Sequence, residues 1–180
     1  MNKRQWGVGL CLIAGMLVMG CATRLTKPAG IPAPVKVRLG TFANVELRPV
    51  TISDAYAGAG ANQKAGRKIN ELLNAQMAYV FPHVNAAEKK DGKTLEIIPL
   101  IKEIKFIGGA ARFWAGAMAG SSAVLMEVTY LDKETGEEIA RAEFYDQANA
   151  YAGAQNMGAT DNLMLQTVVK QIIDYTSANR

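Results

Sequence analysis

The pattern of apolar residues between Val35 and Val50 is typical of a β-strand. Val35, Val37 and Leu39 alternate with two basic residues, so that one face of an extended chain is apolar and the other is charged. We therefore predict a strand with one buried face in this stretch. Residues 53–61 are rich in Gly and Ala and show no hydrophobic period, which predicts a loop.

A helical pattern follows the loop. Between residues 62 and 80, apolar residues recur three or four positions apart and polar residues occupy the other side, which predicts an amphipathic helix. Pro82 marks its end. Residues 94–107 are then mostly apolar, as in a largely buried strand, and Pro99 indicates a bulge or a sheet edge within it.

Two further strands and a helix complete the pattern. Residues 122–131 place apolar side chains on one face, the stretch 132–137 (DKETGE) predicts a turn, and residues 139–145 return as the partner strand. Gly136 supplies the positive φ that such a hairpin loop often requires. A second Gly/Ala-rich stretch, residues 148–159, leads to a last predicted helix over residues 161–176.

This order of elements predicts one α+β domain over residues 35–180. Strand, helix, strands, hairpin and helix favour a single mixed or antiparallel β-sheet with two helices packed on one face. Roughly 145 residues is the usual size of one domain and is enough for one sizeable core.

The first 20 residues have the pattern of a secretory signal peptide. Lys3 and Arg4 precede an apolar run from Trp6 to Val18, which is shorter than a membrane-spanning helix requires. The ending Val18-Met19-Gly20-Cys21 resembles the lipobox of bacterial lipoproteins, which implies that Cys21 receives a diacylglyceryl group and becomes the new N-terminus. The alternative is an uncleaved signal anchor in which Cys21 is an incidental thiol.

The residues after the cysteine refine this prediction. Ala22 is not the Asp that retains lipoproteins at the inner membrane, so in a Gram-negative host the resemblance implies the periplasmic face of the outer membrane. Residues 21–34 comprise the lipidated N-terminus and a stretch with three prolines, which predicts a semi-extended tether. The predicted organisation is therefore signal peptide 1–20, tether 21–34 and periplasmic domain 35–180.

The cysteine content is typical of an exported protein whose stability must come from its hydrophobic core and not from disulfides. Cys11 is removed with the signal and Cys21 would be lipidated, so no disulfide remains. The 20 basic residues fall to 18 without Lys3 and Arg4, against 16 acidic ones. This near-neutral balance gives no support to a nucleic-acid partner.

Recognisable catalytic patterns are absent from the sequence. His83 is the single histidine, so no second histidine or free thiol completes a zinc site. Residues 132–136 superficially resemble an aspartyl-phosphate motif, but Glu134 breaks its spacing and a hairpin turn explains the same residues. The stretch 58–68 could hold a phosphate near Lys64, although this lysine is not at P-loop spacing. We expect no enzyme activity, no metal and no cofactor.

The stretch from residue 107 to 122 (IGGAARFWAGAMAGSS) is too short between charges to span a membrane and lacks the residues of a nucleotide loop. Gly116 and Gly120 have the four-residue spacing seen where backbones approach closely. With Phe113 and Trp114 as packing residues, we predict a connection that packs on the domain's own sheet or on another subunit.

A family resemblance follows from the same region. Arg112, Gly116 and Gly120, a strand, and then Asp132 to Ala140 match the pattern R-x-x-x-G-x-x-x-G followed by D-x-x-T-G-x-x-[IL]-A. This pattern resembles an uncharacterised family of bacterial lipoproteins with a domain of unknown function. The predicted architecture is also distantly similar to periplasmic domains of secretion-channel lipoproteins, including the curli exporter.

Three functional hypotheses follow. The first is a membrane-anchored periplasmic lipoprotein that acts as a non-catalytic structural or adaptor component of a cell-envelope assembly. The second is a periplasmic carrier or sensor of a small ligand. The third is a subunit of an oligomeric outer-membrane secretion assembly. The expected partners are the membrane, through Cys21, and an envelope protein or further copies of the chain.

Overall fold

The computed structural model of the chain describes Leu25 and residues 34–107, 121–148 and 159–180. A short 3-10 helix, Leu39–Thr41, precedes the sheet. The further elements are β1 (Asn44–Leu47), β2 (Thr51–Ile52), α1 (Asp54–Ala57), α2 (Gly60–Val80), β3 (Thr94–Lys105), β4 (Ala123–Asp132), β5 (Glu138–Gln147) and α4 (Ala159–Ala178).

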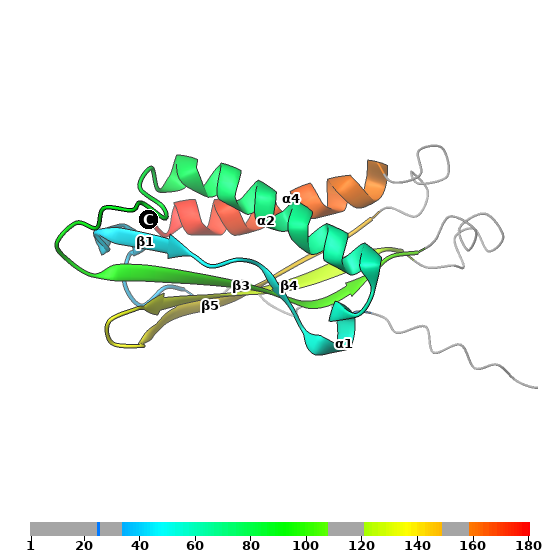
Figure 1. Cartoon of the computed structure of the whole chain (residues 1–180), viewed down its shortest axis with the longest axis horizontal. Helices are drawn as coiled ribbons and strands as arrows, with labels where there is room; N and C mark the ends of the chain where they lie inside the picture. Colours follow the sequence, from blue (N-terminus) through cyan, green and yellow to red (C-terminus); the bar gives the residue numbers. More distant parts are fainter. Residues whose placement is uncertain (1–24, 26–33, 108–120, 149–158) are drawn as a thin grey trace, which may run out of the picture.

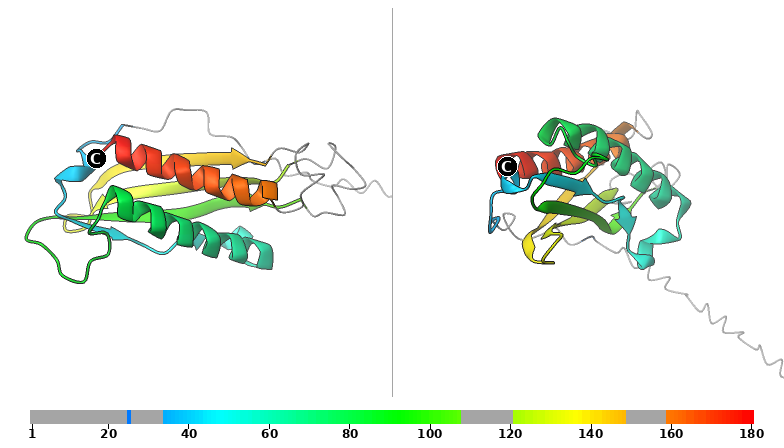
Figure 2. Two further views of the ribbon diagram at one scale, coloured as in Figure 1. Left: turned by 90° about the horizontal axis from the view of Figure 1, so that it is seen from above. Right: turned by 60° about the vertical axis from the view of Figure 1, so that its left-hand side comes forward.

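The strands form one mixed sheet in the order β1-β3-β4-β5, and β2 pairs with β3 along the same edge as β1. β1 and β2 run parallel to β3, whereas β3 pairs antiparallel with β4, and β4 pairs antiparallel with β5. The helices α2 and α4 lie side by side over one face of this sheet (Figures 1 and 2). This confirms the predicted α+β fold with two helices on one face.

The core lies between the sheet and the two helices. α2 contributes Ile69, Leu73 and Met77, which recur every four residues and are at most 1% exposed. α4 contributes a similar stripe that includes Val168 and Ile172, both fully buried. Each such side chain stabilises the fold by roughly 1.5–3 kcal/mol relative to its exposed state, so this layer is the main source of stability.

The prediction of a strand that starts at Val35 is wrong. Residues 35–38 form no strand and Val37 is 45% exposed, whereas the first strand begins at Asn44. The segment instead bonds to separate elements: the N–H of Lys36 donates to the carbonyl of Ile139, and that of Leu39 donates to the carbonyl of Asn179. Its apolar alternation therefore does not reflect pairing with a neighbouring strand.

The predicted loop over residues 53–61 is also partly wrong, because it contains α1 and the first residues of α2. β2, directly before it, has only two residues and was not predicted. The remaining strands and both long helices lie where the patterns placed them, within a few residues at each end.

Pro99 lies opposite an interruption of the parallel edge. β3 pairs with β1 as far as Ile97 and with β2 again directly after the proline. The carbonyls of Ile97 and Ile101 both accept hydrogen bonds from the side of β1 and β2. Pro99 lies midway between them, so its nitrogen points to the same side. A local edge thus accommodates the missing N–H. The bulge of β3 falls instead at Lys102.

Candidate functional site

The residues that the sequence singled out as candidate sites lie outside the described residues. They are Cys21, Arg112, Phe113, Trp114, Gly116 and Gly120. The described residues that flank the two Gly/Ala-rich stretches meet at one end of the sheet: Ser122 accepts the N–H of Ile107 on its hydroxyl (3.0 Å) and the N–H of Ala148 on its carbonyl (2.8 Å). Both stretches therefore start from the same end of the domain.

The strands present a second face, opposite the helices, that we call the open face (Figure 2). Cross-strand partners share a face, and the paired residues fix its membership. Its residues include Glu46, Glu96, Ile98, Leu100, Lys102, Glu127, Thr129, Leu131, Glu138, Arg141, Glu143 and Tyr145. Most are half-buried, and apolar and charged side chains alternate across the strands, as on a solvent-facing antiparallel sheet.

At the centre of the open face, a bulge resolves a repulsive pair. Glu127 of β4 lies directly opposite Glu143 of β5, a like-charged cross-strand pair that is unfavourable by itself. The bulged Lys102 places its Nζ atom 2.5 Å from Glu143 and 3.3 Å from Glu127. The hydrogen bond to Glu143 is the main cause that raises the pKa of Lys102. The lysine therefore lies between the two carboxylates and reduces the repulsion between them.

Arg141 extends this ion-pair network along β5. Its Nη1 atom donates to Glu127 (2.9 Å), while Nε and Nη2 both donate to one carboxylate oxygen of Glu138 (3.0 and 2.5 Å). These bonds lower the pKa of Glu138 and raise that of Arg141. The network is thus continuous from β3 to the outer edge of the sheet.

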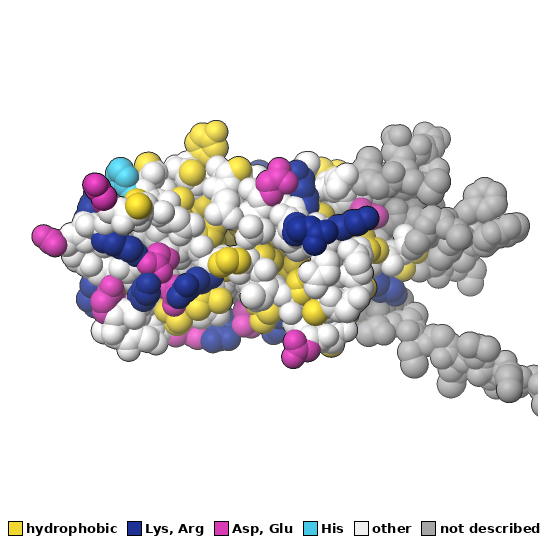
Figure 3. Space-filling view, in the orientation of Figure 1, with side chains coloured by type: hydrophobic (Ala, Val, Ile, Leu, Met, Phe, Trp, Pro, Cys, Tyr) yellow, Lys and Arg dark blue, Asp and Glu magenta, His cyan; other side chains and the backbone are white. Residues whose placement is uncertain are grey.

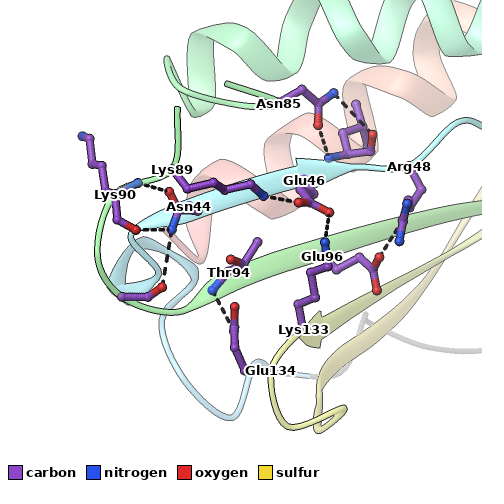
Figure 4. A network of polar contacts seen from close by, with 12 residues as sticks. Asn44, Glu46, Arg48, Asn85, Lys89, Lys90, Thr94, Glu96, Lys133 and Glu134 are labelled. Carbon is purple, nitrogen blue, oxygen red and sulfur yellow. Dashed lines mark hydrogen bonds and ion pairs between the residues drawn. The ribbon is translucent and has the colours of Figure 1, made fainter. Parts of the chain in front are cut away.

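A second polar network lies at the end of the sheet opposite Ser122, where it joins β1 to loops that are distant in the sequence (Figure 4). Glu46 accepts hydrogen bonds from Lys133 (2.6 Å) and from Lys89, and these two bonds lower its pKa to about 2. Asn44 exchanges two 2.8 Å hydrogen bonds with the backbone of Lys90. These contacts hold the segment that precedes β3 against β1. At this end of the molecule, acidic and basic side chains alternate on the surface (Figure 3).

The stretch that resembles an aspartyl-phosphate motif forms the predicted hairpin turn. The Asp132 carboxylate, 2% exposed, accepts the N–H groups of Glu134 and Thr135 and pairs with Lys93 at 2.5 Å. Gly136 has the positive φ, +72°, that the turn requires. These bonds lower the pKa of Asp132, with the Lys93 pair as the main cause. Asp132 therefore has a structural role in the turn.

A groove of about 450 Å³ lies between β2 and α2. It is lined by Pro49, Val50, Thr51, Ile52, Ala57, Gln63, Gly66, Arg67 and Asn70. Two of its amide side chains are already engaged, since Gln63 donates to Ala57 and Asn70 accepts from Val50. Lys64, the lysine of the phosphate hypothesis, is exposed on α2 and is not part of the lining.

Metal-binding clusters and membrane-spanning helices are both absent from the described ranges. There, no group of three or more His, Cys, Asp or Glu side chains is placed to hold a metal ion. In the same part of the chain, no helix is both long and apolar enough to cross a membrane. His83 is exposed just after the end of α2.

Comparisons with known proteins give likenesses of architecture. No family model matches the chain, and no curated protein matches it in sequence. Among solved structures, it is similar to the PelC dodecamer from Paraburkholderia phytofirmans, with 12% identity, a TM-score of 0.46, and coverage of 76% of this chain and 89% of that one. It is also similar to a DUF330 protein from Xanthomonas campestris, with 10% identity, a TM-score of 0.46, and coverage of 82% and 94%. Lipoproteins are among these similar structures, such as a minor lipoprotein from Acinetobacter baumannii with 11% identity, a TM-score of 0.39, and coverage of 78% and 96%.

Proposed function

We propose that this chain is a periplasmic lipoprotein, attached to the outer membrane through Cys21, that acts as a non-catalytic structural or adaptor component of a cell-envelope assembly. One observation carries the proposal: a basic start, a short apolar run, a small residue and Cys21 occur in that order before a Pro-rich tether. The tether leads directly into the folded domain, whose sheet and helices begin after residue 38.

The chemistry of a lipidated cysteine fits stable attachment. A single acyl chain gives only marginal, reversible membrane binding, at about 0.8 kcal/mol per buried CH₂, whereas two or more chains hold a protein stably. A diacylglyceryl group on Cys21 would thus fix the domain to the membrane even though the net charge of the chain without residues 1–20 is near neutral.

The polar networks support the adaptor part of the proposal. The pKa shifts of Glu46, Lys102 and Arg141 arise mainly from hydrogen-bonded partners of opposite charge. Such pairs hold strands and loops together, and the open face combines them with half-buried apolar side chains such as Ile98 and Leu131. Non-obligate protein interfaces are about as apolar as the rest of a protein surface, so a face of this mixed composition is compatible with recognition of another protein.

Replacement of Cys21 tests the attachment. Cys21→Ser should abolish labelling of the protein with radioactive fatty acid and leave an uncleaved or mislocalised precursor in cell fractions. Cys11→Ser is the matched control, because it removes the other cysteine and should leave labelling intact. A Cys21→Ser protein that is still acylated and still membrane-bound would contradict the proposal.

The adaptor role is tested by photo-crosslinking in intact cells. A photoreactive side chain at Thr129, on the open face, should yield a crosslinked envelope protein that can be identified by mass spectrometry. The same side chain at Tyr79, which is 87% exposed on α2, is the control for random encounters. Equal yields at the two positions, or none at either, would count against an adaptor that uses the open face.

The groove between β2 and α2 favours a second candidate function, a carrier or sensor of a small ligand. It lies between the sheet and the helix that follows a Gly/Ala-rich segment. Native mass spectrometry of the purified chain would detect a bound small molecule. Gln63→Trp, which fills the groove, should abolish that mass shift, while Tyr79→Trp on the same helix should not.

A further inference from the structure

β5 is the edge strand of the sheet, and alternate residues direct their backbone groups outward. Just after β5, the N–H of Ala148 donates to the carbonyl of Ser122, which directly precedes β4. The even-numbered residues of β5 therefore direct their backbone N–H and C=O groups towards β4. The odd-numbered residues therefore present their N–H and C=O groups to the outside. Two contacts agree with this assignment: the carbonyl of Ile139 accepts from Lys36, and that of Tyr145 accepts from Gln171.

Between these two contacts, the described residues leave the edge of β5 unpaired. The outward backbone groups of Arg141 and Glu143 have no hydrogen-bond partner among the residues that the structure describes. An unpaired strand edge is a template for another strand. The contacts at Ile139 and Tyr145 restrict that template to the central residues, so any added strand has a narrow choice of register.

We propose that β5 pairs antiparallel with β5 of a second copy of this chain, around a two-fold axis at Ala142. In this register, Arg141 lies opposite Glu143 of the partner subunit, and the two residues exchange both backbone hydrogen bonds. The symmetry repeats the pair on the other side of the axis.

Charge selects this register over its neighbours. Outward-facing residues must lie opposite each other, so the nearest two-fold alternatives are centred on Arg141 or on Glu143. The first places two arginines opposite each other and the second two glutamates, and like charges directly opposite are destabilising. Only the register centred on Ala142 makes both cross-strand pairs complementary.

The side chains can form these pairs without breaking those within the domain. A guanidinium has five N–H groups, and Arg141 uses three of them towards Glu127 and Glu138. Glu143 accepts from Lys102 on Oε1, and its Oε2 accepts no hydrogen bond from the residues that the structure describes. The Arg141 side chain is 50% exposed and that of Glu143 34% exposed, so both are accessible at the edge.

Cysteine crosslinking tests the register. Full-length chains with Arg141→Cys and with Glu143→Cys are purified in detergent, mixed and mildly oxidised. The mixture should give a yield of disulfide dimer several-fold higher than either variant alone. In the proposed register, positions 141 and 143 of the two subunits lie directly opposite each other, with Cα atoms about 5.5 Å apart. The distance between position 141 and the same position of the second subunit exceeds the roughly 7 Å limit for a disulfide. The unsubstituted chain controls for Cys11 and Cys21. Equal crosslinking in the mixture and in the single variants would overturn the register.

A proline tests the edge itself. Glu143→Pro removes only an outward N–H, so it should spare the ladder to β4 and abolish the dimer in analytical ultracentrifugation. Glu143→Ala keeps the N–H and should retain a dimer, and circular dichroism checks that both variants fold. A monomeric parent chain, or equal dimerisation of the two variants, would refute the proposal. Neither result depends on lipidation, so the proposed attachment at Cys21 can fail or succeed independently.

Discussion

The two faces of the sheet differ in the burial of their side chains and in the number of charged groups that they carry. On the face covered by α2 and α4, residues such as Ile97 and Met126 are fully buried against the helices. On the open face, their direct neighbours Ile98 and Glu127 are half-buried, and charged side chains are held in ion pairs. Because consecutive residues of a strand point to opposite faces, both properties come from the same three strands.

This difference indicates which face determines stability. A fully buried apolar side chain contributes roughly 1.5–3 kcal/mol, whereas an exposed ion pair contributes about 0.2–1 kcal/mol. The open face can therefore change its side chains at small cost to the fold, and it is the face on which recognition can be specified. The covered face has no such freedom.

Neighbouring isoleucines on opposite faces provide the sharpest test. Ile97→Ala should lower the free energy of unfolding by about 2–5 kcal/mol, because it leaves a cavity in a site that is 0% exposed. Ile98→Ala, one residue along β3, should cost about 1 kcal/mol or less because its side chain is only half-buried. Urea unfolding measures both. Similar costs for the two variants would break the comparison of the faces.

A buried hydrogen bond between the covered face and α4 gives a second test of how strongly this face stabilises the fold. The Tyr130 hydroxyl lies 2.7 Å from Thr176 Oγ1, and Thr176 in turn bonds the carbonyl of Ile172. Both side chains are 0% exposed, and burial raises the pKa of Tyr130. Thr176→Val should cost about 1–3 kcal/mol, because it leaves a buried hydroxyl without its acceptor.

A double-mutant cycle isolates this bond. Tyr130→Phe should cost less, about 0.5–1.5 kcal/mol, since Thr176 keeps its bond to Ile172. Once Tyr130 is Phe, the cost of Thr176→Val should fall. Strictly additive costs in thermal or urea unfolding would show that the two hydroxyls are not coupled.

The covered face is also the part of the fold that the sequence predicted well. Alternation in residues 122–131 and the helical spacing of Ile69, Leu73 and Met77 reflect burial against one neighbour, which periodicity detects. The same rule misled at Val35 to Leu39, where apolar and basic residues alternate although the segment forms no strand. β2 is too short for any period to be visible.

The open face could not be predicted in the same way. The Lys102 bulge and the pairing of Glu46 with Lys89 and Lys133 join residues from distant parts of the sequence, so only the folded topology brings them together. The lipobox-like ending at Cys21, by contrast, is a local motif that is visible in the sequence alone. Its role remains a prediction.

The smallest predicted effect concerns Glu46 on the open face. Its pKa is about 2 in the folded chain and 4.5 as a reference value, because Lys133 and Lys89 favour the charged form. A depressed folded pKa stabilises the fold above the unfolded pKa, so this contribution is present above pH 4.5 and is lost as the pH falls from 4.5 towards 2. The two lysine side chains are 45% and 40% exposed, so solvent screens the pairs and the contribution should be about 1 kcal/mol or less.

Glu46→Gln tests this sign and size. The variant should be less stable than the parent chain by about 1 kcal/mol or less near neutral pH, and the difference should shrink as the pH is lowered to about 3. Added salt should also reduce the difference, because these charges are exposed. Gln is a close match in shape, so packing on the sheet is unchanged. If the difference instead grows at low pH, or matches the cost of Ile97→Ala, then the open face determines stability as strongly as the covered one.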